Sequence, residues 1–196
     1  MLTVEGLFTA TYEVKRSLFI GNICGVGSKQ AAVAFIRAQK VKYSVATHNV
    51  YAFILQAENL QKSSDDHEPK GTAGPSVLNV LQNQQLTNVV LVVTRYFGGI
   101  LLGAGGLVRA YSAAAQTVIK CASLVPLKVF LNIEIIINYS LFNRVENIFA
   151  AYDVVVVETM FLDCVHIKLK VSDETKCEFK TALFDVCSGD LIWHSE

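Results

Sequence analysis

A buried-strand pattern that runs directly into a glycine-rich loop constrains this chain more than any other feature. Residues 89–93 read Val-Val-Leu-Val-Val, and five glycines follow between Gly98 and Gly106. A helix pattern resumes at once. Glycine lacks a Cβ and adopts positive φ, so such a loop lets the backbone come close to another group. The stretch 92–111 therefore predicts either a tight, closely packed strand-to-helix turn or a site where the backbone meets a ligand.

The same stretch carries candidates for anion binding. The first N–H groups of a helix attract anions, and Arg makes forked hydrogen bonds to phosphate or carboxylate. Aromatic residues beside the glycines could stack on a base or belong to the core. Polar residues elsewhere in the first half could complete the site, although a histidine there could equally be structural. The predicted ligand-binding residues are Arg95, Tyr96, Gly98, Gly99, Gly103, Gly105, Gly106, Arg109, Lys70, Thr72 and His48.

The distribution of charge gives a second indication of an anionic partner. The chain has 17 basic and 17 acidic residues, so its formal net charge is zero. Residues 1–127 nevertheless hold 11 basic and 6 acidic residues, a net charge of +5, and the remainder has −5. This asymmetry indicates that the first half faces an anionic partner, or that each half simply has a solvated, charged surface.

The cysteines and the N-terminus indicate a reducing compartment. The five cysteines lie far apart without a Cys-x-x-Cys pair, which fits neither a disulfide framework nor a metal cluster. No signal-peptide pattern and no apolar run of membrane-spanning length is visible. We expect a cytoplasmic protein without membrane contact, and its oligomeric state is open.

Hydrophobic periodicity in the first half predicts alternating strands and helices. We expect strands at 7–14, 18–26, 50–55 and 89–93, and helices at 29–40, 76–84 and 106–122. Residues 56–74 are polar and show no period, so they predict a long loop, which in a compact domain is usually functional or disordered.

That loop contains three carboxylates in four residues: Asp65, Asp66 and Glu68. Their mutual repulsion requires compensation, which a hard cation such as Mg²⁺, Lys70 or an arginine of the glycine loop could supply. Alternatively, the carboxylates accept backbone N–H bonds and fix the loop. We predict no cofactor and no metal ligand, with a divalent cation at this acidic loop as the alternative. No catalytic residue is predicted, because no base is visible beside Ser17 or Thr72.

The order of predicted strands and helices in the second half is typical of a ferredoxin-like domain. We expect strands at 129–137, 154–158, 161–171 and 191–193, and helices at 140–152 and 173–186, the latter capped by Ser172 or Asp173. This β-α-β-β-α-β order is the split-βαβ arrangement. Pro126 marks a break, and we therefore place the domain boundary so that residues 1–127 and 128–196 form separate α+β domains.

Two motifs together resemble those of the YigZ/IMPACT family. Residues 65–74, Asp-Asp-His-Glu-Pro-Lys-Gly-Thr-Ala-Gly, resemble its acidic motif, and residues 94–111 resemble its glycine-rich motif. Two departures occur in the acidic motif: His67 stands where the family prefers glycine, and Pro75 follows Gly74 directly instead of lying two residues after it. A histidine at a position that needs positive φ would rearrange the loop.

The resemblance implies a fold for each domain and a role connected with translation. It implies a βαβ-type first domain like the second domain of a small-subunit ribosomal protein, and a second domain like the C-terminal domain of elongation factor G. Eukaryotic members, which are similar only in the first domain, regulate translation under amino-acid starvation. The resemblance thus favours a non-enzymatic binding protein for RNA, the ribosome or a translation-regulatory protein. The alternatives are a metal-dependent enzyme for a small phosphorylated or acidic substrate, and a pure protein-interaction module.

Overall fold

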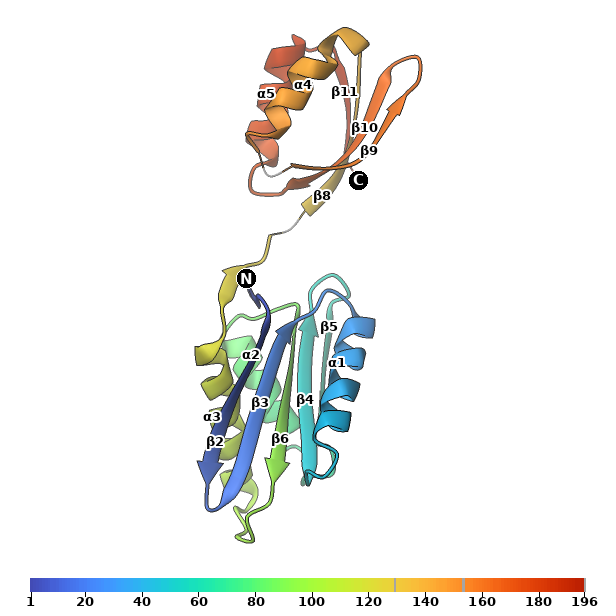
Figure 1. Ribbon diagram of the computed structural model, residues 1–196. Helices are drawn as coiled ribbons and strands as arrows, with labels where there is room; N and C mark the ends of the chain where they lie inside the picture. The colour runs from blue at the N-terminus through green and yellow to red at the C-terminus, as the bar shows by residue number, and fades with distance from the viewer. Residues whose placement is uncertain (129, 153, 196) are drawn as a thin grey trace. The chain divides into compact units, whose positions relative to one another are not determined.

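The computed structural model describes residues 1–128, 130–152 and 154–195. The chain divides into two compact units, Met1–Leu127 and Lys128–Glu196. Each unit has its own sheet and its own buried hydrophobic residues (Figure 1). Among the described residues, no helix is both long enough and apolar enough to cross a membrane.

The N-terminal unit is built on a five-stranded antiparallel sheet. Its strands lie in the order β2-β3-β6-β4-β5. Their bounds are Leu7–Val14 for β2, Ser17–Gly25 for β3, His48–Leu55 for β4, Leu60–Ser64 for β5 and Val89–Tyr96 for β6. A separate two-stranded ribbon pairs β1 (Leu2–Val4) with β7 (Leu124–Pro126).

Helices cover both faces of this sheet. Helix α1 (Lys29–Lys42) packs on one face, while α2 (Gly74–Asn83) and α3 (Ala104–Cys121) pack on the other (Figure 1). Successive strand residues point to opposite faces. Strand β6 is central and buried on both faces, so its Val-Val-Leu-Val-Val run shows no alternation of apolar and polar residues.

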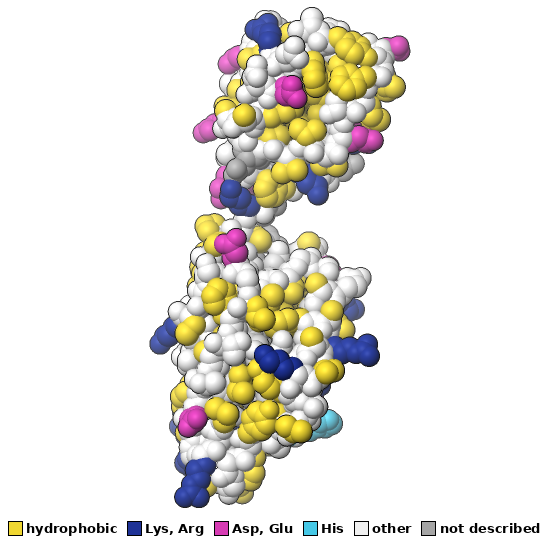
Figure 2. All heavy atoms as spheres, viewed as in Figure 1, with side chains coloured by type: hydrophobic (Ala, Val, Ile, Leu, Met, Phe, Trp, Pro, Cys, Tyr) yellow, Lys and Arg dark blue, Asp and Glu magenta, His cyan; other side chains and the backbone are white. Residues whose placement is uncertain are grey.

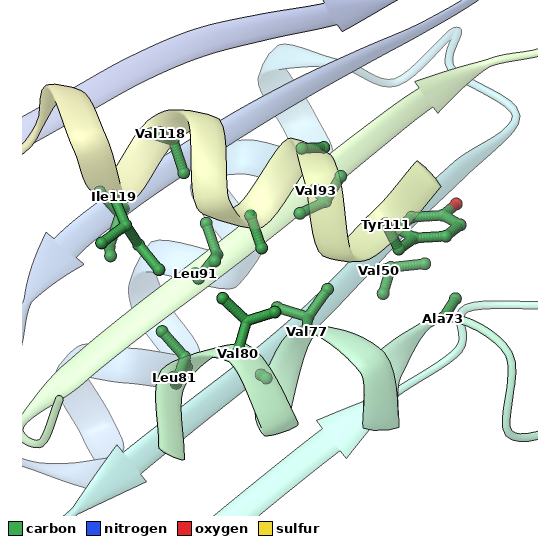
Figure 3. Packing of buried hydrophobic residues seen from close by; sticks show 14 of the residues in the cluster. Val50, Ala73, Val77, Val80, Leu81, Leu91, Val93, Tyr111, Val118 and Ile119 are labelled. Carbon is green, nitrogen blue, oxygen red and sulfur yellow. The ribbon is translucent and has the colours of Figure 1, made fainter. Parts of the chain in front are cut away.

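The larger core lies between the sheet and helices α2 and α3 (Figure 3). Helix α2 contributes Val77 and Leu81, helix α3 contributes Val118, and they meet Leu91 and Val93 of β6, all of them fully buried. Complete burial of each such side chain stabilises the fold by about 1.5–3 kcal/mol. This packing holds α2, α3 and β6 together. It therefore also fixes both ends of the loop that joins β6 to α3.

The C-terminal unit is a four-stranded antiparallel sheet with two helices on one face. Strands β8 (Phe130–Ile137), β9 (Val154–Phe161), β10 (Val165–Ser172) and β11 (Leu191–Ser195) lie in the order β11-β8-β10-β9. Helices α4 (Phe142–Phe149) and α5 (Lys176–Cys187) complete the β-α-β-β-α-β order, and a 3₁₀ turn (Tyr139–Leu141) precedes α4. The predicted ferredoxin-like arrangement and the α+β class are confirmed.

Several predicted elements were wrong in detail. Residues 56–74 are not one loop, because Leu60–Ser64 forms the edge strand β5 against β4. Its sequence, Leu-Gln-Lys-Ser-Ser, is polar because one face of an edge strand meets solvent. Helix α5 begins at Lys176 instead of 173, and its N-cap is Thr175, not Ser172 or Asp173. Strand β10 begins at Val165 because residues 162–164 form the hairpin turn. The predicted start of β8 at position 129 lies outside the described residues.

Candidate functional site

The first carboxylate of the acidic loop caps a helix. Oδ1 of Asp65 accepts hydrogen bonds from the backbone N–H groups of Ala73 and Gly74, at 3.0 and 2.8 Å, and Oδ2 accepts one from Gly71 at 2.8 Å. Burial by itself raises the pKa of Asp65, but these bonds to the charged form outweigh burial and hold the pKa below its ordinary value. Asp65 therefore satisfies two of the free donors at the start of α2, Ala73 N and Gly74 N, and the N-cap residue itself makes no side-chain cap bond.

The second carboxylate joins the loop to the sheet and to α1. Oδ2 of Asp66 accepts a hydrogen bond from the backbone N–H of Asn49 at 2.6 Å, and Oδ1 pairs with Lys40. Burial raises the pKa of Asp66, yet the Lys40 and Asn49 bonds, with His67 nearby, lower it overall. Asp66 and His67 have φ values of +44° and +70°. The position of His67 therefore does require the left-handed conformation that favours glycine.

The third carboxylate lies at the centre of a buried polar cluster. Oε1 of Glu68 accepts hydrogen bonds from Nη1 of Arg95 at 2.7 Å and from the hydroxyl of Tyr111 at 2.8 Å. Glu68 is 7% exposed and Arg95 5%. Burial, followed by the nearby Glu68 charge, raises the pKa of Tyr111 and keeps the hydroxyl protonated as a donor. In Figure 3 this hydroxyl points away from the aliphatic cluster.

Aromatic rings enclose the guanidinium of Arg95. The rings of Phe19 and Phe97 each lie 5.5 Å from its central carbon, within cation–π distance. Phe97 is 45% exposed and so forms the outer side of this arrangement. Nε of Arg95 has no hydrogen-bond partner among the described residues. Arg95 is thus part of the interior and does not project from the surface.

A pocket of about 390 Å³ opens beside this cluster. Its polar wall includes His48 and Glu68, its apolar wall includes Phe97 and Leu107, and its third wall is the start of α3 at Gly103. Nδ1 of His48 lies 2.8 Å from the carbonyl oxygen of Asp66, and Nε2 lies 3.8 Å from Oε1 of Glu68. The pocket thus brings together His48, the acidic loop, Arg95 and the glycine loop, which are distant in the sequence.

Different physical constraints act on the glycines of the loop. A Cβ on Gly98 would lie 2.0 Å from the backbone carbonyl of Arg16, so only glycine fits. Gly99 and Gly103 have φ values of +83° and +71°. Gly105, within the first turn of α3, has an ordinary φ and nothing within 4 Å of the Cβ it lacks. Contacts inside the protein therefore do not require glycine at position 105. Because Gly105 is exposed and has no side chain, another molecule can come close to its backbone.

The turn that meets Gly98 is basic. Lys15 and Arg16 form the β2–β3 turn with φ values of +46° and +64°, and both are exposed. Ser17, which follows, accepts a hydrogen bond from Gly98 N at 3.2 Å. Figure 1 shows the β2–β3 turn and the β6–α3 loop at the same end of the N-terminal unit, where Figure 2 shows basic side chains. In the sequence this turn is visible only as two adjacent basic residues, and no pattern connects Lys15 and Arg16 with the glycine loop.

The predicted ligand-binding residues separate into three groups. The pocket is lined by His48, Arg95 and Gly103. Thr72 and Tyr96 form the second group, which does not line the pocket. Thr72 is buried and donates a hydrogen bond to the Pro69 carbonyl at 2.7 Å. Tyr96 points to the opposite sheet face from Arg95, because strand residues alternate. The remaining residues lie on or close to the surface of the unit: Lys70, Gly98, Gly99, Gly105, Gly106 and Arg109.

The three carboxylates do not converge. Asp65, Asp66 and Glu68 each contact a different set of partners. Within the described residues, no group of three or more His, Cys, Asp or Glu side chains could hold a metal ion. The acidic loop is therefore held by N–H and cationic groups of the protein itself.

Comparison with known proteins gives two family matches. Residues 15–119 match the Impact N-terminal domain, and residues 135–190 match a domain of unknown function, DUF1949. The first match covers β3–β6, α1, α2 and all but the last two residues of α3, and thus every residue that lines the pocket.

Two relatives cover at least 90% of this chain, and a solved structure covers all of it. The IMPACT family member YvyE of Bacillus subtilis is 32% identical over 90% of this chain and 82% of its own length. A Haemophilus influenzae IMPACT family member is 34% identical over 92% of this chain and 89% of its own. Human Protein IMPACT is 41% identical over 64 residues, which is 20% of its length. A crystal structure of a hypothetical protein superposes with a TM-score of 0.77 at 26% identity and covers 100% of this chain and 96% of its own.

Proposed function

The chain belongs to the IMPACT family, and from this premise we propose that its N-terminal unit binds RNA on the ribosome without catalysing a reaction. The family resemblance connects this unit with the regulation of translation. The net charge of +5 on residues 1–127 supports an anionic partner. The proposed contact surface, called the glycine tip below, comprises Lys15, Arg16, Phe97 and Gly98–Gly106.

One observation carries the proposal: the start of α3 opens beside a basic turn. Gly103 caps α3 without a side-chain hydrogen bond, and the first turn holds no acidic residue. The first N–H groups of a helix are unsatisfied and favour phosphate. The close approach of Gly98 to Arg16 places Lys15 and Arg16 beside the same loop. Exposed Phe97 offers a ring on which a base can stack, and base–aromatic stacking contributes about 1–3 kcal/mol per base.

Co-sedimentation with ribosomes and with free RNA over a salt series tests the proposal. We expect binding that weakens as salt rises, because phosphate contacts release counterions. The variant Lys15→Ala/Arg16→Ala should bind less tightly and reduce the salt slope by about 0.7 for each lost contact to a single strand. The matched control Lys29→Ala/Lys42→Ala removes the same charge from exposed positions on α1 and should retain both affinity and slope.

The possible results distinguish an error in the proposed contact surface from an error in the proposed RNA binding. Equal loss in both double variants would indicate an unspecific charge effect and would remove the glycine tip as the contact surface. No sedimentation with either ribosomes or RNA, even at low salt, would overturn the proposal as a whole.

A further inference from the structure

We propose that the pocket beneath the glycine loop binds a small zwitterionic molecule, with its protonated amine at Glu68 and His48 and its acidic group at the start of α3. This inference goes beyond the proposed binding of RNA, because it concerns a small molecule held at Glu68 and His48, which lie outside the glycine tip. The pocket shares Phe97 and residues 101–104 with the tip. It rests on the polar atoms that line the pocket and on the apolar wall between them.

Glu68 supplies the first reason for an amine. Both hydrogen bonds that this side chain accepts go to Oε1, and none of the described residues donates one to Oε2. The side chain is almost completely buried and lines the pocket. An ionised carboxylate can accept hydrogen bonds at both oxygens, so Oε2 in the pocket wall favours a ligand that carries N–H groups.

His48 supplies the second reason. Its Nδ1 faces the carbonyl oxygen of Asp66 at 2.8 Å. A carbonyl oxygen only accepts, so Nδ1 carries the hydrogen and Nε2 of the neutral ring carries a lone pair. Nε2 lies 3.8 Å from Oε1 of Glu68, and both residues line the same pocket. Two neighbouring acceptors favour a group with several donors, and a primary ammonium has three.

The start of α3, which also lines the pocket, favours an acid. Gly103 and Ala104 line the pocket at the start of α3, where no side chain caps the helix. The N–H groups of the first turn favour a carboxylate or phosphate there. The charge of Glu68 is already offset by Arg95, so a ligand without net charge leaves the pocket electrically balanced.

Apolar side chains set the character of the ligand between its two charged ends. They are Leu101, Leu102, Leu107 and Phe97. The volume of about 390 Å³ falls at the lower end of the range of about 300–1,000 Å³ that small-molecule sites occupy. An α-amino acid with an apolar side chain is the simplest molecule with this chemistry.

Isothermal titration calorimetry of the full chain with a matched ligand series tests the proposal without altering the fold. The probes are L-leucine, leucinamide, which lacks the carboxylate, and 4-methylpentanoate, which lacks the amine. We expect L-leucine to bind, and each analogue to bind at least about tenfold more weakly, because each loses a hydrogen bond to a charged group. L-Methionine and L-phenylalanine extend the series if the pocket prefers another apolar side chain.

Two variants locate the binding. Leu101→Ala removes an exposed side chain from the wall of the pocket and should weaken L-leucine binding, whereas Leu7→Ala, on β2 and outside the pocket, should not. Equal binding of the three probes would overturn the proposal, and so would absence of binding by any of the amino acids at about millimolar concentration. The variant Lys15→Ala/Arg16→Ala should bind L-leucine normally, so failure of RNA binding and failure of this pocket are distinguishable.

Discussion

Oε1 of Glu68 lies 2.7 Å from Nη1 of Arg95, and this contact joins the acidic motif to the end of the central strand β6 inside the protein. We expect Arg95→Met to destabilise the N-terminal unit by about 3–5 kcal/mol, because it leaves the Glu68 carboxylate buried without its cation. Urea unfolding followed by circular dichroism measures the change. The double variant Glu68→Gln/Arg95→Met should recover part of the loss, and equal stability of wild type and Arg95→Met would contradict a buried ion pair.

The cap of α2 gives a second prediction. Asp65 accepts three backbone N–H bonds at the start of this helix. Asp65→Ala removes all three acceptor contacts and should lower the free energy of unfolding by about 1–2 kcal/mol. Glu13→Ala, on the exposed face of β2, is the control and should change it by less than about 0.5 kcal/mol. A loss of equal size in both variants would exclude the capping role.

The pH dependence of stability follows from the lowered pKa values of Asp65 and Asp66. In the unfolded chain an Asp takes up its proton near its ordinary pKa of about 3.9. In the folded protein both carboxylates stay charged to lower pH. Their stabilisation is therefore fully present above the ordinary value and is lost as the pH falls through the lower, folded values. Urea unfolding between about pH 5 and pH 2 should show this decline, and Asp65→Asn/Asp66→Asn should make it shallower.

The glycine loop gives two substitutions of opposite sign. Gly98→Ala should destabilise the protein strongly, because the added Cβ would overlap the backbone of Arg16 at 2.0 Å. Gly105→Ala should stabilise it by about 0.4–1 kcal/mol, because alanine restricts the unfolded chain and nothing obstructs its Cβ. If a ligand approaches the backbone here, the same Gly105→Ala variant should bind RNA less tightly despite its greater stability. Unchanged binding would remove Gly105 from the glycine tip.

Local patterns sufficed for most of the fold. The β-α-β-β-α-β order of the second half could be predicted because its strands alternate in hydrophobicity and its helices have an apolar face. The strand β5 could not, because Leu60–Ser64 has one apolar residue and is recognised only by its pairing with β4. Residues 94–96, which continue β6 to Tyr96, were likewise missed, because they are polar or aromatic and owe their strand conformation to pairing with β3 and β4.

The composition of the site depended more on contacts between distant residues. The motifs identified Glu68, Arg95 and His48 as candidates, but no periodicity indicates that Tyr111, 43 positions from Glu68, donates to the same oxygen. The sequence also could not separate Arg95 from Arg109. The former is buried between Phe19 of β3, Phe97 and Glu68 of the acidic loop, whereas the latter is exposed on α3.

The final prediction concerns independent folding of the two units. The buried residues of Met1–Leu127 and of Lys128–Glu196 form separate clusters, and each unit has its own sheet. We therefore expect residues 1–127 and 128–196, produced separately, each to unfold cooperatively in urea. The shorter fragment should have the smaller m-value, because m scales with the surface exposed on unfolding, and the lower stability, because small domains bury a smaller fraction of their surface. If either fragment lacked a cooperative transition while the full chain showed a single one, the two units would form one folding unit.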